Sequence, residues 1–173
     1  KIVEDLDMIA KLESGVLELR MRPLDLAALV RDEMTDAARQ ASVKGIQLVN
    51  ELPDDLRVQA DPGRLEQVFT NLIDNAIHYG RPGGRVVVRA IDLEGGQVLV
   101  EVSDNGIGIA AQHLPRLFER FYRVDKSRAR KEGGSGLGLA IVKHIVEAHG
   151  QSITAKSAEG EGTTFAFTLA KAR

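Results

Sequence analysis

The sequence contains no cysteine and no tryptophan, and aromatic residues make up only 4% of its 173 residues. The absence of cysteine excludes disulfide bonds and thiolate metal sites. No run of about 18 apolar residues occurs, so the sequence predicts no membrane-spanning helix. Neither sign of charge dominates: 23 Lys and Arg stand against 25 Asp and Glu, a net charge of −2. Such a chain creates no overall field that would attract nucleic acid or a lipid surface, and we expect no nucleic-acid partner.

Hydrophobic residues make up 43% of the chain, enough for one domain with a real core. Their spacing predicts helices at 1–14, from Pro23 to about Gly45, from Asp61 to Gly80, and at 136–149. Strands are expected at 46–52, 56–60, 85–92, 97–104, 151–158 and 163–170. Helices and strands are mixed without strict alternation. This order predicts an α/β two-layer sandwich, in which helices cover one face of a mixed sheet.

Two asparagines one turn apart, Asn71 and Asn75, occur in the third predicted helix and are followed by His78 and Tyr79. Asparagine is a mediocre helix former, because its amide competes for nearby backbone groups. At 100° per residue, the two amides and the imidazole fall within roughly 60° of one another and face away from the apolar stripe. One interpretation is a solvated polar face. The alternative is a ligand site, because an amide oxygen suits Mg²⁺ and a tyrosine ring suits a base or ribose.

A second unusual segment, DNGIGI, follows the strand predicted to end at Asp104. Its Asn-Gly pair is a strong hairpin signal. The residues after it, however, do not alternate as a returning strand would. We favour a pocket, in which the carboxylate accepts a hydrogen bond from an exocyclic amine. Gly106 and Gly108 would let the backbone approach a flat ring, with Ile109 as part of an apolar wall.

A third segment, GGSGLGLAIVKHIVEAHG (133–150), is rich in glycine and opens a helix. Such a helix start presents free N–H groups and a positive dipole end, which suit phosphates. The ten residues before it, 123–132, hold five basic and two acidic residues, a net charge of +3. This stretch is either a solvated loop or a lid over a phosphate site, and we favour the lid.

Taken together, these segments resemble the catalytic, ATP-binding domain of bacterial sensor histidine kinases, in the superfamily shared with gyrase and MutL. The similar motifs are an N box at 71–80, glycine boxes at 103–109, 133–143 and 160–165, and an F box at 117–123. The resemblance implies a Bergerat-type ATP-binding domain at 23–173 with a mobile lid at about 122–135. Residues 1–22 resemble the end of the dimerisation and phosphoacceptor domain with its linker. Because the chain begins inside a helical pattern, we expect it to be part of a longer protein.

The family's functional residues can be carried over by position. Asn75 would bind Mg²⁺, and Asn71 would contact a phosphate or the metal shell. His78 stands where the family usually has a lysine that contacts phosphate. Tyr79 would pack on the adenine, and Asp104 would recognise its amino group. The other ATP-binding positions implied are Gly106, Gly108, Ile109, Arg123, Gly134, Ser135, Gly136, Leu137, Gly138 and Thr163.

The implied reaction is transfer of the γ-phosphoryl group of Mg-ATP to a histidine in two-component signalling. None of the chain's four histidines precedes an acid on an exposed helix, so the acceptor is expected outside this chain. His149 is interpreted as a cation at a helix end. In gyrase-like ATPases a glutamate that activates water stands where Asn71 stands here. An amide cannot remove a proton, which favours transfer over hydrolysis.

The resemblance also implies partners: the dimerisation domain of the same kinase and a downstream response regulator. We expect the full protein to be a membrane-anchored homodimer whose catalytic domain is cytoplasmic, and this fragment to be a monomer. Phe118 and Phe121 are expected to anchor the lid, whose sequence is most similar to the phosphate-responsive subgroup. Two alternatives stay open: an ATP-binding regulatory module without transfer activity, and an ATPase of the same fold.

Overall fold

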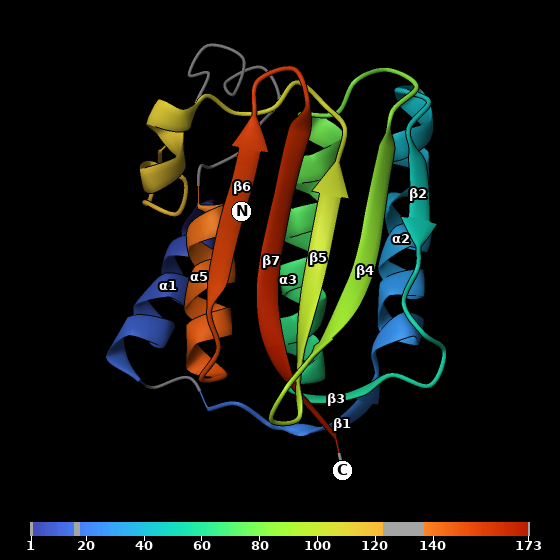
Figure 1. The fold of residues 1–173 in the computed structure, drawn as a ribbon. Helices are drawn as coiled ribbons and strands as arrows, with labels where there is room; N and C mark the ends of the chain where they lie inside the picture. The colour runs from blue at the N-terminus through green and yellow to red at the C-terminus, as the bar shows by residue number, and fades with distance from the viewer. Residues whose placement is uncertain (1, 16–17, 123–136, 173) are drawn as a thin grey trace.

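A mixed sheet with helices over one of its faces forms the structure (Figure 1). The computed structural model describes residues 2–15, 18–122 and 137–172. The helices are α1 (Ile2–Ser14), α2 (Leu26–Val43), α3 (Pro62–His78), the short 3₁₀ helix η1 (Ala111–Arg116) and α5 (Gly138–Ala148). The strands are β1 (Arg22–Asp25), β2 (Gln47–Asn50), β3 (Arg57–Ala60), β4 (Arg85–Leu93), β5 (Gln97–Asp104), β6 (Ile153–Ala158) and β7 (Gly162–Lys171). The predicted α/β two-layer sandwich is confirmed.

The sheet has the strand order β1-β3-β7-β5-β4-β2, and β6 pairs with β7 beside this path. β2 and β4 run parallel, whereas the other paired strands are antiparallel. The register places Asp104, at the end of β5, opposite Thr163, near the start of β7. The last turn of α3 lies at this same end of the sheet, the upper end in Figure 1.

The second helix does not begin at Pro23, as the sequence predicted, but at Leu26. Pro23 belongs instead to β1, an edge strand that runs antiparallel to β3 with Pro23 opposite Gln59. A proline has no N–H to donate, and an edge strand tolerates this loss. Asp25 then caps α2 by accepting a hydrogen bond from the Ala28 N–H at 3.1 Å. The strand exists because of a partner 36 residues away (23 to 59), which local periodicity does not report.

Helix α3 packs its apolar face against the sheet. The stripe predicted from the sequence is buried throughout: Leu65, Val68, Phe69, Leu72, Ile73, Ala76 and Ile77. The predicted cap is also confirmed, since Asp61 accepts a hydrogen bond from the Arg64 N–H at 3.1 Å and Pro62 occupies the first helical position.

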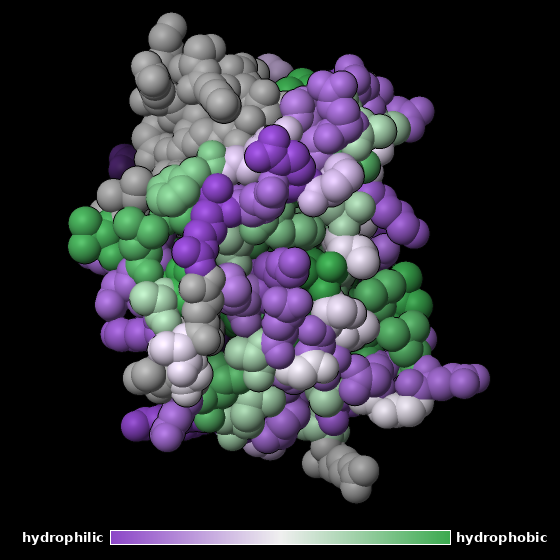
Figure 2. All heavy atoms as spheres, turned by 90° about the vertical axis from the view of Figure 1, so that its left-hand side faces the viewer, coloured by the Kyte–Doolittle hydropathy of each residue, from purple (hydrophilic) through white to green (hydrophobic). Residues whose placement is uncertain are grey.

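Helix α5 is apolar nearly all round because it has neighbours on several sides. It packs against α3 on one side, and α1 and β6 also contact it. On α1, Ile9 is 1% exposed, whereas Val3 and Leu6 point to solvent. Figure 2 views the side of the molecule on which α1 and α5 lie, and apolar and hydrophilic residues are interspersed there. None of the helices in the described ranges has the length and apolar composition that a bilayer crossing requires.

Replacing Phe69 with alanine should destabilise the fold strongly. Its ring is fully buried, with its centroid 5.7 Å from that of Phe167. We expect Phe69→Ala to lower the free energy of unfolding by about 3–5 kcal/mol, measured by urea denaturation. Val43→Ala is the control, because Val43 is 84% exposed on α2 and should change stability by about 0.5 kcal/mol or less. Similar losses in the two variants would contradict this account of the core.

Candidate functional site

The predicted polar face of α3 meets the start of α5. Asn71, Asn75 and His78 lie in the last two turns of α3 and are half-buried. The Asn71 Nδ2 atom donates a hydrogen bond to the Gly138 carbonyl oxygen at 3.2 Å. No other residue in the described part of the chain hydrogen-bonds the Asn75 amide. A fully solvated polar face is therefore excluded for Asn71, and the Asn75 amide oxygen is available for a ligand.

The loop after β5 lies against the C-terminal end of α3. The neighbours of β5 are β4 and β7, so the chain after Asp104 does not return as a hairpin. Instead, the Gly106 N–H donates to Asp104 Oδ1 at 2.9 Å and the Ile107 N–H donates to the Tyr79 carbonyl oxygen at 3.1 Å. The hairpin alternative is wrong, and Asp104 and Tyr79 belong to one contiguous surface.

Two glycines in this loop are required by the chain's own packing. A Cβ atom on Gly106 would lie 2.1 Å from the Tyr79 carbonyl oxygen, and one on Gly108 would lie 2.1 Å from that of Ala158. Gly108 also has a φ of +74°. Their role toward a flat ring stays a prediction, because these contacts already explain both residues. Gly138 differs: among the described residues, the nearest atom to its Cβ position is Asn71 Cγ at 3.8 Å, an ordinary contact.

The loop is held on its other side by Ser157, which the sequence analysis missed. Its hydroxyl accepts a hydrogen bond from the Ile109 N–H at 2.7 Å and donates to the Gly162 carbonyl oxygen at 2.7 Å. The Thr163 hydroxyl lies 2.9 Å from it. The side chains of Ile109 and Thr163 are buried. Ile109 thus packs in the core behind the loop. A serine in an alternating strand gives no signal of such contacts.

Burial raises the pKa of the Asp104 carboxyl above its ordinary value. The backbone N–H groups of Gly106 and Thr163 act in the opposite direction but do not offset the loss of water. The Asp104 carboxyl thus has few contacts with water, and its oxygens can accept a further hydrogen bond. This combination suits recognition of a hydrogen-bond donor on a ligand.

The C-terminal end of α3 is stabilised by a lysine from α2's end. Lys44 Nζ donates to the carbonyl oxygens of Ile77 and His78, at 3.0 and 2.7 Å. A cation here adds a donor to the last carbonyls at the negative end of the helix dipole. The His78 and Tyr79 rings meet edge to face with centroids 4.6 Å apart. Nothing local in the sequence indicates the role of Lys44, because its partners are 33 and 34 residues away.

His149 is not the helix-end cation that the sequence predicted. Its Nδ1 atom faces the Ile145 carbonyl oxygen at 2.8 Å and must donate to it. Its Nε2 atom accepts a hydrogen bond from the Asp61 N–H at 3.1 Å. An imidazolium has no nitrogen lone pair left to accept with, so this arrangement requires the neutral ring.

Phe118 and Phe121 differ in their packing, but lid residues 123–135 lie outside the described part of the chain, so the anchoring role stays a prediction for both. The Phe118 ring packs edge to face on Phe165 with a centroid distance of 6.0 Å. Phe121 is 49% exposed. Tyr122 hydrogen-bonds His113.

Several predicted positions lie outside the described residues: Arg123, Gly134, Ser135 and Gly136, together with lid residues 123–135. The Leu137 side chain is fully buried, so only its backbone could meet a ligand.

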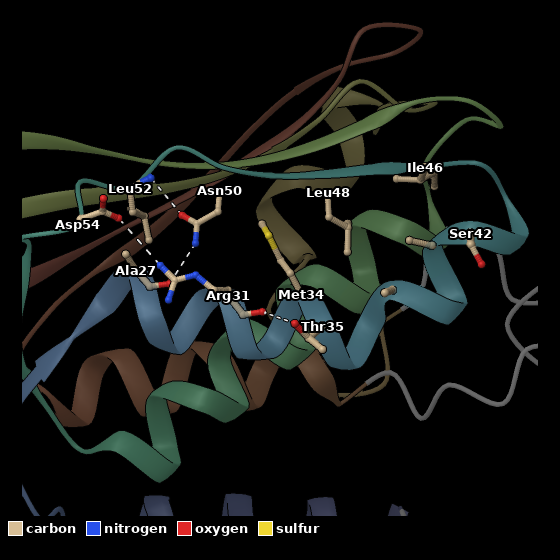
Figure 3. A pocket seen from close by; sticks show the side chains of 12 residues that line it. Ala27, Arg31, Met34, Thr35, Ser42, Ile46, Leu48, Asn50, Leu52 and Asp54 are labelled. Carbon is tan, nitrogen blue, oxygen red and sulfur yellow. Dashed lines mark hydrogen bonds and ion pairs between the residues drawn. The ribbon is translucent and has the colours of Figure 1, made fainter.

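A cavity of about 490 Å³ lies elsewhere, between α2 and β2 (Figure 3). It contains none of the candidate residues. Its polar groups bind one another, as in the Asn50 Nδ2 bond to the Ala27 carbonyl oxygen at 3.0 Å and the Arg31–Asp54 ion pair at 3.9 Å. The amides of α3, the Asp104 carboxylate and the start of α5 meet instead at the end of α3, so we place the functional site there.

These features define a class: a two-layer α/β domain with amides on a helix end, a half-buried carboxylate at a strand end and a glycine-opened helix beside them. Residues 60–173 match the family model of histidine kinase-, DNA gyrase B- and HSP90-like ATPases. The chain belongs to this family.

Named relatives agree with this assignment. The chain is 39% identical to the sensor histidine kinase WalK of Bacillus subtilis (strain 168) over 98% of its own length, but spans only 28% of that protein. The full-length ShkA structure in complex with AMPPNP is 31% identical with a TM-score of 0.86, covering 99% of this chain and 36% of ShkA. The mycobacterial sensor histidine kinase MprB is 30% identical with a TM-score of 0.76, covering 88% of this chain and 98% of the MprB chain.

Because the pKa of Asp104 is raised, the free energy of unfolding should depend on pH in a way that a variant without this carboxyl group does not share. A group whose folded pKa exceeds its unfolded value stabilises the fold while protonated, and this contribution is lost as the pH rises through the folded pKa. The asparagine of Asp104→Asn can still accept from the Gly106 N–H. The variant should therefore gain stability relative to the wild type between about pH 3 and pH 7. Urea denaturation across this range measures the difference, and a constant difference would contradict the burial of the charge.

Proposed function

We propose that this chain is the ATP-binding catalytic part of a sensor histidine kinase. It binds Mg-ATP and transfers the γ-phosphoryl group to a histidine of the dimerisation domain. The family membership and the named relatives support this proposal. Because the chain spans 28% of the WalK relative, activity of the whole protein is inferred from the part.

One observation carries the proposal: the hydrogen bond from Asn71 Nδ2 to the Gly138 carbonyl oxygen. It joins the amide-bearing face of α3 to the N-terminal end of α5. Free N–H groups and a positive dipole end at such a helix start attract phosphates. The Asn75 amide, one turn beyond Asn71, can supply a neutral oxygen to Mg²⁺ beside them.

Each side chain would then have a distinct task. The Asp104 carboxylate would accept a hydrogen bond from the adenine amino group, with the Tyr79 ring against the base. Gly138 would let phosphate oxygens approach the start of α5, and His78 would add a donor. Mg²⁺ on Asn75 would neutralise phosphate charge. Phosphoryl transfer depends mainly on such positioning and charge stabilisation.

The chemistry of Asn71 separates transfer from hydrolysis. In the transfer reaction, the bond between the γ-phosphorus and the bridging oxygen of ATP breaks, a phosphorus–nitrogen bond forms on the acceptor imidazole, and ADP leaves. A neutral imidazole is already a nucleophile. Hydrolysis would require a base for water, and the Asn71 amide donates its N–H to Gly138 and cannot take up a proton. An ATPase of the same fold and a binding module without transfer remain the alternative functions.

The proposal includes partners beyond this chain. The phosphoacceptor would lie on the dimerisation domain of the same kinase, and the phosphoryl group would pass to a response regulator. The full protein would be a membrane-anchored homodimer with this domain on the cytoplasmic side. The names of the relatives as sensor kinases support this arrangement.

Incubation of the chain with a cognate acceptor domain, Mg²⁺ and labelled ATP tests the function. We expect phosphohistidine on the acceptor, and Asn75→Ala should lower its rate of formation by about 100-fold through loss of the metal ligand. Gln40→Ala, a change to an exposed amide on α2, is the control and should leave the rate unchanged.

Other results would favour the alternatives. Phosphate release without phosphohistidine, unaffected by Asn71→Ala, would favour an ATPase. Nucleotide binding with neither product would favour a regulatory module.

Gly138→Ala tests whether the glycine at this position is required for ligand binding or for the stability of the fold. The described part of the chain leaves room for the added Cβ, so the free energy of unfolding should stay the same or rise by about 0.5–1 kcal/mol. If phosphate approaches this backbone, affinity for Mg-ATP in calorimetry should fall about tenfold. Gly106→Ala should instead destabilise the fold, because its Cβ would meet the Tyr79 carbonyl oxygen at 2.1 Å. Unchanged ATP affinity in Gly138→Ala would remove this residue from the site.

A further inference from the structure

Helices α3 and α5 run side by side in opposite directions and are joined at both ends (Figure 1). At the end that carries the candidate site, Asn71 Nδ2 bonds the Gly138 carbonyl oxygen at 3.2 Å. At the far end, the Asp61 N–H bonds His149 Nε2 at 3.1 Å. Asp61 precedes the first turn of α3, and His149 follows the last turn of α5. The far bond therefore fixes the two helices at the end remote from the site.

Asp61 also binds the segment that leads into the domain. Its Oδ1 atom caps α3 through the Arg64 N–H at 3.1 Å, and its Oδ2 atom accepts from the Arg20 N–H at 2.9 Å. We call Arg20, Asp61 and His149 the basal junction, and residues 18–22 the linker. Three chain segments far apart in sequence thus meet at one residue.

Other contacts place the linker and α1 on the same base. The linker runs directly into β1, where Arg22 lies opposite Ala60, the residue before Asp61. Helix α1 packs against α5, and Arg64 Nη1 lies 3.5 Å from the Met8 sulfur. The upstream segments therefore contact the base of the two helices whose other ends form the candidate site.

The Asp61 carboxylate is suited to stay charged in this position. Partial burial raises its pKa, but the N–H groups of Arg20, Arg64 and Gly63 and the charge of the Arg64 guanidinium together lower it by more, so the net shift is downward. Each oxygen of Asp61 accepts a hydrogen bond from a backbone N–H, that of Arg20 or that of Arg64. The contact with Arg20 therefore depends on the position of the backbone and not on the side chain at position 20.

We propose that Asp61 and His149 are positioning residues that couple the linker to the nucleotide site through α3 and α5. A helix of 17 residues is a rod of about 25 Å, so a displacement at its first turn is carried to its last. The Asp61 carboxylate binds the linker and caps the first turn of α3, so it fixes the position of that turn relative to the linker. His149 bonds the Asp61 N–H, so a displacement of Asp61 also displaces the end of α5. The half of this inference that concerns nucleotide rests on the function proposed above.

Coupling of this kind is reciprocal: if the linker affects the nucleotide site, then bound nucleotide must affect the linker. Amide hydrogen exchange of the 173-residue chain measures protection both at the nucleotide site (71–79) and in the linker. Three variants separate the contacts. Asp61→Ser keeps one oxygen to cap α3 but loses the second acceptor for Arg20. His149→Leu removes the acceptor for the Asp61 N–H, and His149→Gln retains a carbonyl oxygen in its place.

Asp25→Ser is a matched control. Asp25 caps α2 with nearly the same backbone geometry as Asp61 (φ −83° and ψ 106°, against −83° and 114°). Helix α2 carries none of the candidate site residues, and the Asp25 carboxylate caps α2 through the Ala28 N–H, whereas His149 bonds Asp61 and Ile145. A loss common to both serine variants therefore measures the cap alone.

The first arm uses no nucleotide. Loss of one hydrogen bond to a charged group should speed exchange of the linker amides by about tenfold in Asp61→Ser. His149→Leu should also speed linker exchange, although it does not touch the linker, and His149→Gln should restore the wild-type rate. Linker exchange that is unaffected by His149→Leu would overturn the junction, whether or not the chain binds ATP.

The second arm adds Mg²⁺ and AMPPNP at saturation. In the wild type and in Asp25→Ser, nucleotide should slow exchange both at 71–79 and in the linker. In Asp61→Ser and His149→Leu, the protection at 71–79 should persist and that in the linker should be lost. Linker protection that persists in both junction variants, or is absent in the wild type despite protection at 71–79, would overturn the coupling. Absence of protection at 71–79 in the wild type would instead count against the proposed function.

Discussion

The hydrogen bond from the Ile107 N–H to the Tyr79 carbonyl oxygen is the contact on which the candidate site depends. It joins the loop after β5 to the end of α3, and the approach is so close that Gly106 has no room for a Cβ atom. Without it, the carboxylate at the strand end and the amides on the helix would belong to separate surfaces. This backbone contact thus fixes the position of the loop relative to α3, and thereby the positions of the site's side chains.

Much of this arrangement could be predicted from local patterns. Three features each depend only on a few neighbouring residues, and all three are found in the structure: the apolar period of α3, the cap at Asp61 and the strand ending at Asp104. The features that were missed have distant partners. β1 depends on pairing with β3, and Lys44 and His149 bind groups 33 to 88 residues away. A sequence pattern reports which residues lie on one face, but not which other segment that face will meet.

The glycines show the same limit in a different way. A glycine-rich loop suggests room for a ligand, yet Gly106, Gly108 and Gly162 each let two parts of the chain's own backbone touch. Gly138 has no such neighbour among the residues that the structure describes, which makes it the more informative glycine about a phosphate. Asp104 illustrates a related conflict between stability and function: its burial disfavours the charged form that a base-recognition role requires.

The seating of α1 on α5 has an energetic consequence for the molecule as a whole. Among the α1 side chains that the structure describes, Ile9 is the buried apolar one, and burying one isoleucine is worth about 1.5–3 kcal/mol. That free energy corresponds to a preference of roughly ten- to a hundredfold for the seated helix. The contribution of Ile9 alone thus makes detachment of α1 rare, and the contacts of Met8 and the burial of Asp5 come in addition to it.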